Sequence, residues 1–218
     1  CIRDRYSLWK IYDIHKAIIT GDFIFTYAGA RISKISEKAL AIISRSIYRT
    51  TLGILLESLP FNYPGPKYEI YTEVLKLKTG ELFAGATELG ALATDNEAYK
   101  SPAYRYGLLL GEAYQIADDI FDLRTLTNDG ETIDLKPVKL AIMYFGKFGE
   151  TESKELWKIN DAEKIMAIAK EINLESKLFG LLNDKLREIQ NVLRFFPETP
   201  FKTFISFVPK YMVEAMMR

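Results

Sequence analysis

The chain has 218 residues, enough for one large domain or two small ones. Hydrophobic residues make up 48% of it and aromatic residues 13%, which is ample for a core, and 29 basic residues balance 29 acidic ones. This balance provides no global attraction for nucleic acid or a membrane surface, so any anion site must come from local clusters of Lys and Arg.

Cys1 is the only cysteine and His15 the only histidine. A single cysteine excludes an internal disulfide framework and a Cys-based zinc site, and a lone histidine excludes a two-His metal site. No signal peptide is visible and no apolar run reaches about 18 residues, so we expect no membrane span. The expected location is the cytoplasm.

Hydrophobic periodicity predicts helices along almost the whole chain, after a basic and aromatic start over residues 1–10. The turn cluster FNYPGP at 61–66 separates two helices, a kink is expected at Lys78–Gly80, and residues 125–137 form a loop around Asn128-Asp129-Gly130. No strand pair or repeat is evident, so we predict an all-α helical bundle forming a single domain over 1–218. The expected helices are 12–32, 33–59, 67–77, 81–93, 103–124, 138–148, 151–158, 161–171, 175–195 and 200–216.

The most informative stretch runs from Leu108 to Leu123 and reads LLLGEAYQIADDIFDL. It is apolar enough for a buried helix, yet four polar residues recur at offsets of 0, 3, 4 and 7, which places them on one helical face. Three carboxylates crowded on an apolar helix repel one another unless a cation lies among them, and Mg²⁺ prefers oxygen ligands. The four residues are Gln115, Asp118, Asp119 and Asp122. The alternative is a solvated acidic face on an ordinary amphipathic helix.

Two further clusters supply the groups that metal-bound diphosphate chemistry requires. Lys78-Thr79 offers an ammonium and a hydroxyl at a helix interruption, and Asp134 and Lys139 follow the loop after the central helix. In such chemistry carboxylates hold cations, lysines neutralise the outer phosphate oxygens, and an apolar bundle houses a hydrocarbon tail.

With these motifs the chain resembles the trans-isoprenyl diphosphate synthases, the polyprenyl synthetase family. The segment GEAYQIADDIFD (111–122) is similar to the family's second aspartate-rich motif, and LKTGELF (77–83) to its Lys-Thr motif. AIITGD (17–22) resembles a segment that usually reads AINAGD, and Gly53–Glu57 resembles the family's Gly-Gln-x-x-Asp segment with Ile54 in place of the glutamine. Four motifs in the expected order make the resemblance specific.

The resemblance implies an all-α bundle around a central cavity that binds an allylic diphosphate through Mg²⁺. Ionisation of that diphosphate gives an allylic carbocation, isopentenyl diphosphate attacks it head to tail, and a proton is lost. Asp118 would coordinate magnesium with Asp119 and Asp122 in support, and Asp118, Lys78 and Lys139 would be the catalytic residues. The diphosphate would be bound by Lys78, Thr79, Gln115 and Lys139, with Arg3 at the position of the family's paired arginines.

The sequence departs from the family pattern in several places. No first aspartate-rich motif precedes Ile14, and we expect that an N-terminal portion is missing or lies on another chain. Glu131 stands where a phosphate-binding lysine is common, and Ala141 ends the motif that contains Lys139. These departures leave open a second reading, a non-catalytic or regulatory subunit of a heteromeric synthase. The resemblance also implies a homodimer or heterodimer, and the product chain length stays open.

Overall fold

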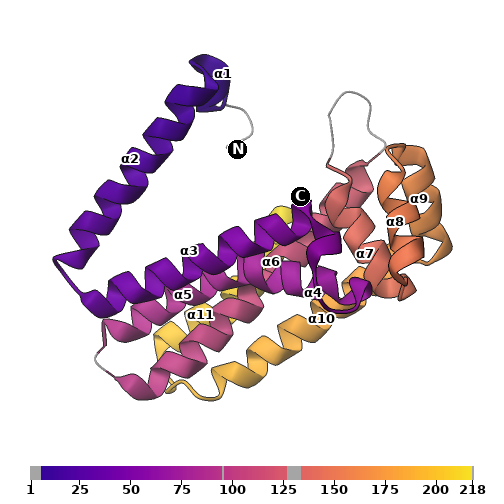
Figure 1. The fold of residues 1–218 in the computed structure, drawn as a ribbon. Coiled ribbons are helices and arrows are strands. Elements are labelled where there is room, and N and C mark those ends of the chain that lie inside the picture. Colours follow the sequence, from indigo (N-terminus) through magenta and orange to yellow (C-terminus); the bar gives the residue numbers. More distant parts are fainter. Residues whose placement is uncertain (1–5, 95, 127–133, 218) are drawn as a thin grey trace. The chain divides into compact units, whose positions relative to one another are not determined.

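The computed structural model describes residues 6–94, 96–126 and 134–217. All regular elements among these residues are helices, as predicted (Figure 1). The chain divides into two compact units, Cys1–Ser44 and Arg45–Arg218, with the boundary inside helix α3. Each unit is described by itself below.

The first unit contains α1 (Leu8–Ile11), α2 (Ile14–Ser33) and the start of α3 (Glu37–Ser58). Asp13 caps α2, since its side chain accepts a hydrogen bond from the main-chain N–H of Lys16 at 2.8 Å. No residue of α2 is buried, and Phe23 and Tyr27 stack on its surface with ring centroids 6.0 Å apart.

The second unit is built around α6 (Lys100–Thr125), the longest helix described. Leu109, Ala113, Ile116 and Ile120 recur at helical spacing on it and are fully buried. Helix α5 (Glu81–Leu92) packs along α6, and α10 (Leu174–Leu193) covers another side. The central position of α6 therefore follows from its apolar periodicity.

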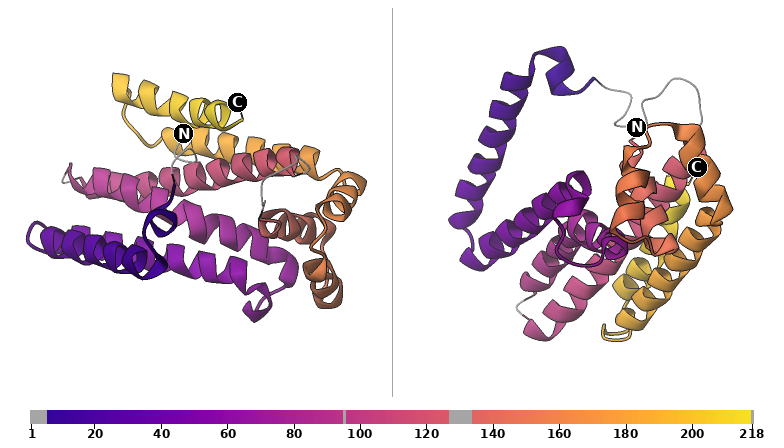
Figure 2. Two further views of the ribbon diagram at one scale, coloured as in Figure 1. Left: turned by 90° about the horizontal axis from the view of Figure 1, so that it is seen from above. Right: turned by 45° about the vertical axis from the view of Figure 1, so that its right-hand side comes forward.

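The other helices of this unit complete the core around α6. Figure 1 shows α7 (Lys136–Gly146), α8 (Glu150–Lys158) and α9 (Ala162–Glu171) gathered at one end, and Figure 2 shows α11 (Pro200–Met216) beside α10. Short helices η2 (Pro60–Asn62), η3 (Lys67–Glu69) and α4 (Ile70–Val74) link α3 to α5, and η5 (Glu97–Tyr99) leads into α6. Their buried apolar residues form one continuous core.

Several predicted boundaries differ from the structure by a few residues, and two of the differences have clear local reasons. Helix α6 begins at Lys100 rather than 103, because Pro102 lies in the first turn, where a missing N–H breaks no intrahelical hydrogen bond. The kink expected at Lys78–Gly80 is a π-helical segment, η4 (Leu75–Gly80), which joins α4 to α5 without a break. The predicted loop over 125–137 lies largely outside the described residues, which omit 127–133. Its described ends are shorter than predicted, because α6 includes Thr125 and α7 begins at Lys136, with Pro137 in the first turn.

Helix α3 is, by length and composition, apolar enough to cross a membrane. Only 17% of its most apolar 18-residue stretch is buried. The sequence alone predicts no membrane span, so this differs from the expectation. It is weak evidence for a span, because core helices of soluble proteins meet the same criteria. In the second unit, Arg45 and Arg49 of α3 form ion pairs with Glu88 and Glu81 of α5.

Candidate functional site

The four polar residues of the central helix lie on one face of α6, but their environments differ. Gln115 is 8% and Asp119 only 2% exposed, whereas Asp118 and Asp122 are half-buried. The alternative of a solvated acidic face is therefore wrong for Gln115 and Asp119. Two polar groups buried on an apolar helix require hydrogen-bond partners from the surrounding elements.

The segment η4 supplies the partner of Gln115, because two glycines allow it to approach α3 and α6 closely. A Cβ atom on Gly111 of α6 would lie 2.8 Å from both the Cα of Gly80 and the carbonyl oxygen of Thr79. On the other side, a Cβ atom on Gly53 of α3 would lie 2.4 Å from the main-chain nitrogen of Lys78. Main-chain atoms at these distances leave no room for a side chain, so the two glycines place Lys78 and Thr79 between α3 and α6.

A chain of hydrogen bonds then joins η4, α6 and α4. The hydroxyl of Thr79 donates to Gln115 Oε1 at 2.6 Å, and Gln115 Nε2 donates to Asp119 Oδ1 at 3.0 Å. The other carboxylate oxygen of Asp119 accepts the hydroxyl of Tyr71 at 2.7 Å. The structure thus brings together three residues that the sequence predicts for one site, Thr79, Gln115 and Asp119. It adds Tyr71, which lies about two helical turns before Lys78 and which no sequence motif indicates.

Lys78 belongs to the same cluster through a different partner. Its ammonium lies 2.7 Å from Glu57 Oε1 on α3, and both side chains are largely shielded from solvent. Glu57 is the last residue of the Gly53–Glu57 motif, for which sequence alone suggests no partner. The positive charge of Lys78 is therefore balanced by a carboxylate of this chain.

The electrostatics of Asp119 reflect its burial. Desolvation is the largest effect and raises the pKa of Asp119 from 3.8 to about 7, although the hydrogen bonds from Gln115 and Tyr71 act in the opposite direction. The nearby Asp118 raises this pKa further, whereas Lys78 lowers it. Burial also raises the pKa of Tyr71 well above 10.0, so its hydroxyl remains a donor at neutral pH.

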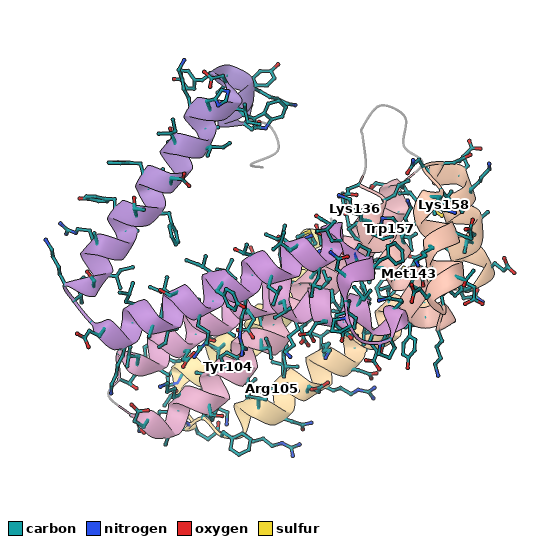
Figure 3. The ribbon with its side chains drawn as sticks, viewed as in Figure 1. Tyr104, Arg105, Lys136, Met143, Trp157 and Lys158 are labelled. Carbon is teal, nitrogen blue, oxygen red and sulfur yellow. The ribbon has the colours of Figure 1, made fainter. Side chains whose placement is uncertain are left out.

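Lys139 lies elsewhere in the unit. It is only 4% exposed on α7, and its ammonium donates to the main-chain carbonyl of Trp157 at 3.0 Å and lies over the indole ring, 5.5 Å from its centroid. Burial lowers its pKa. Figure 3 labels Trp157 on α8. The proposed role of Lys139 in diphosphate binding stays a prediction, because its hydrogen bond is to α8 rather than to the α6 carboxylates.

Other predicted residues fall outside the described part of the chain. Arg3, Gly130 and Glu131 are among them, so their predicted relation to the phosphate site is untested. Asp134, before α7, accepts the main-chain N–H of Lys136, the first residue of that helix, at 3.0 Å.

Mg²⁺ prefers six oxygen ligands and usually retains several waters. Among the described residues, no group of three or more His, Cys, Asp or Glu is arranged to hold a metal ion. Asp118 and Asp122, one helical turn apart, provide the type of ligand that magnesium prefers. They fit one side of a magnesium site. Asp118 Oδ2 also lies 3.4 Å from the donor Gln115 Nε2, and both oxygens of the buried Asp119 accept hydrogen bonds from this chain.

Three surface cavities lie away from this cluster. Two of about 680 Å³ lie between α10 and α11 and among α6, α9 and α10, and one of about 440 Å³ lies beside Arg49 and Tyr104. None of the three is lined by Lys78, Asp118 or Asp122. The central hydrocarbon cavity implied by the sequence stays a prediction.

Comparison with known proteins gives one consistent family. The sequence profile of the polyprenyl synthetase family matches residues 3–173. A prenyl transferase from Cyanidium caldarium is 26% identical over 217 residues, covering 92% of this chain and 65% of that protein. The octaprenyl diphosphate synthase of Escherichia coli is 31% identical over 119 residues, covering 54% of this chain and 36% of that protein. The chain thus spans less than two thirds of the length of these relatives.

Solved structures give the same fold. A decaprenyl diphosphate synthase from Rhodobacter capsulatus superposes with a TM-score of 0.81 at 20% identity, covering 99% of this chain and 71% of the other. A polyprenyl synthase from Caulobacter crescentus, solved with calcium and isoprenyl diphosphate, superposes with a TM-score of 0.74 at 22% identity, covering 96% and 68%. At these identities the likeness establishes the all-helical fold.

Proposed function

The chain belongs to the polyprenyl synthetase family, and on that premise we propose that it is a magnesium-dependent trans-prenyltransferase. It condenses isopentenyl diphosphate head to tail with an allylic diphosphate to make a longer polyprenyl diphosphate. Membership of the family and the all-helical fold support this proposal, and the remaining support comes from the residues themselves.

One observation carries the proposal, the hydrogen-bonded junction between the Lys-Thr motif and the aspartate-rich helix. Thr79 contacts Gln115, and Gln115 contacts Asp119, over distances of 2.6 and 3.0 Å. Two motifs that are 36 residues apart in sequence therefore meet through direct side-chain contacts. A subunit with no binding role has no evident need for these polar groups in the interior, where each costs free energy unless it is satisfied.

In the proposed reaction, this chain's residues bind and orient the allylic diphosphate. Lys78 would place its ammonium against the departing diphosphate, where negative charge increases as the carbon–oxygen bond breaks. Thr79 and Gln115 would hold the phosphate oxygens beside it. No side-chain nucleophile is required, because isopentenyl diphosphate supplies the attacking double bond.

Magnesium would be held by Asp118 and Asp122, and Asp119 would support the site from the interior. When bound, magnesium neutralises diphosphate oxygens electrostatically and thereby favours ionisation. The C. crescentus structure named above contains calcium and isoprenyl diphosphate together, which supports a divalent cation for this family. We further propose that the chain acts as a homodimer or heterodimer.

The test is incorporation of labelled isopentenyl diphosphate into longer products by the purified chain, with an allylic primer and Mg²⁺. The assay is run on the chain alone and together with a polypeptide that supplies the part of the relatives this chain does not span. Product formation that stops when Mg²⁺ is chelated supports the proposal. Absence of product in both preparations contradicts it.

A non-catalytic or regulatory subunit is the second candidate, and two contacts favour it. Lys78 is neutralised by Glu57, and the ammonium of Lys139 is bonded to Trp157. If the chain raises the turnover of an active synthase while making no product itself, even when Asp118 is replaced by Ala, the regulatory function is correct.

A further inference from the structure

Tyr71 is a buried residue that none of the sequence motifs includes. It lies on α4, is 2% exposed, and donates its hydroxyl to Asp119 Oδ2 at 2.7 Å. Its ring packs against Tyr144, with centroids 5.7 Å apart. A buried hydroxyl that donates to a buried carboxylate forms a strong and directional contact.

When Asp119 is ionised, the direction of each hydrogen bond in this network is fixed by its chemistry. Asp119 Oδ1 accepts from Gln115 Nε2, so the amide oxygen of Gln115 faces Thr79 and accepts its hydroxyl. Rotating the amide of Gln115 by 180° would place its oxygen against the carboxylate, which is repulsive. Nε2 also lies 3.4 Å from Asp118 Oδ2, but its shorter hydrogen bond is the one to Asp119. The orientation of Gln115 therefore depends chiefly on the position of Asp119, which depends in turn on Tyr71.

We propose that Tyr71 is a positioning residue of the diphosphate site, acting through Asp119 on Gln115 and Thr79. This inference rests on the proposed function. It also gives the three aspartates different roles: the buried Asp119 would be the internal support, and the half-buried Asp118 and Asp122 would hold magnesium. Tyr71 itself contacts neither the diphosphate nor the metal.

A purely structural role for Tyr71 is the alternative, and the chain offers a matched control. Tyr106 is also a buried tyrosine, 5% exposed, whose hydroxyl donates to the carbonyl of Ile205 at 2.8 Å, away from the aspartates. Both Tyr71→Phe and Tyr106→Phe remove one buried hydroxyl and one hydrogen bond. Only the first removes a contact to Asp119.

The first measurement requires no substrate. Hydrogen exchange of the Gln115 side-chain amide is followed by NMR in the unliganded chain. We expect exchange to accelerate about tenfold or more in Tyr71→Phe and to stay unchanged in Tyr106→Phe, because loss of a hydrogen bond to a charged group changes an equilibrium by about ten- to a hundredfold. Equal exchange in the two variants overturns the inference.

The second measurement is binding of inorganic pyrophosphate in the presence of Mg²⁺ by calorimetry. We expect Tyr71→Phe to bind about tenfold more weakly than wild type, and to add little to the loss already caused by Asp119→Asn, since both act through one contact. A full additional loss in the Asp119→Asn background contradicts the inference. If wild type binds no pyrophosphate, the proposed function fails, and exchange of the Gln115 amide still decides whether Tyr71 orients it.

Discussion

The ammonium of Lys78 lies 2.7 Å from a carboxylate oxygen of Glu57, so the lysine proposed to bind a diphosphate is already paired within the chain. Each side chain comes from a different element, Lys78 from η4 and Glu57 from α3. A negatively charged diphosphate bound at Lys78 would therefore also be repelled by the carboxylate of Glu57.

We expect Glu57→Gln to tighten binding of magnesium pyrophosphate about three- to tenfold, because it removes a negative charge within several ångströms of the ligand at an intermediate dielectric constant. Isothermal titration calorimetry at fixed Mg²⁺ measures this. Glu155→Gln is the control, since Glu155 forms an exposed pair with Lys158. Weaker binding by Glu57→Gln would show that Glu57 instead holds Lys78 in its binding position.

Gly53→Ala should destabilise the chain by about 2–3 kcal/mol, because its Cβ would lie 2.4 Å from the main-chain nitrogen of Lys78 and force η4 away from α3. Gly90→Ala is the matched control, since nothing lies within 4 Å of its Cβ in the α5 helix. Alanine there should stabilise by about 0.5–1 kcal/mol. Urea denaturation measures both, and an unchanged midpoint for Gly53→Ala would disprove the close approach.

Asp119→Asn should gain stability relative to wild type as the pH rises. The folded-state pKa of Asp119 is about 7, raised from 3.8, so the native chain binds more protons than the unfolded chain between these values. The contribution of Asp119 to stability is therefore present below pH 4 and is lost as the pH rises through about 7. Denaturation at pH 5 and pH 8 tests this, and a stability difference between the two proteins that does not change with pH refutes it.

Arg49→Met should cost about 3 kcal/mol of stability. Arg49 donates to Glu81 Oε1 at 2.6 Å, and the Glu81 side chain is fully buried, so the substitution leaves a carboxylate with only the hydroxyl of Tyr104. Arg105, labelled next to Tyr104 in Figure 3, forms an exposed pair with Glu188 at 2.7 Å. Arg105→Met should cost less than about 1 kcal/mol. Equal costs in thermal denaturation would mean that burial of Glu81 adds nothing.

Sequence periodicity predicts most of the fold because the helices carry strong local signals. The central position of α6 agrees with Leu109, Ile116 and Ile120, whose spacing predicts an apolar helical face. The π-helical form of η4 does not follow from local sequence, because it depends on contacts with Gly53 and Gly111 from two other helices. Tertiary packing decided that detail.

The candidate site likewise has one part that local sequence predicts and another that depends on tertiary packing. Gln115 and Asp119 follow from one helical face, and the pairing of Thr79 with Gln115 agrees with their assignment to one site. Tyr71 could not be predicted, because a lone tyrosine on a short helix is more often a core residue than a hydrogen-bond donor to a carboxylate. The motif that contains Lys139 predicts a contact with the diphosphate. The hydrogen bond of Lys139 to Trp157 instead depends on the packing of α8 on α7, which no local pattern indicates.

The most direct test of the central claim, that η4 and α6 form one diphosphate site, is a double-mutant cycle on magnesium-dependent incorporation of isopentenyl diphosphate. Lys78→Ala and Asp118→Ala are measured singly and together, in the preparation that is active with wild type. If both residues act on one bound diphosphate, each single variant loses most of the activity and the combined loss is smaller than the product of the two. Losses that simply multiply, or activity close to wild type in the double variant, would contradict the assignment of the site.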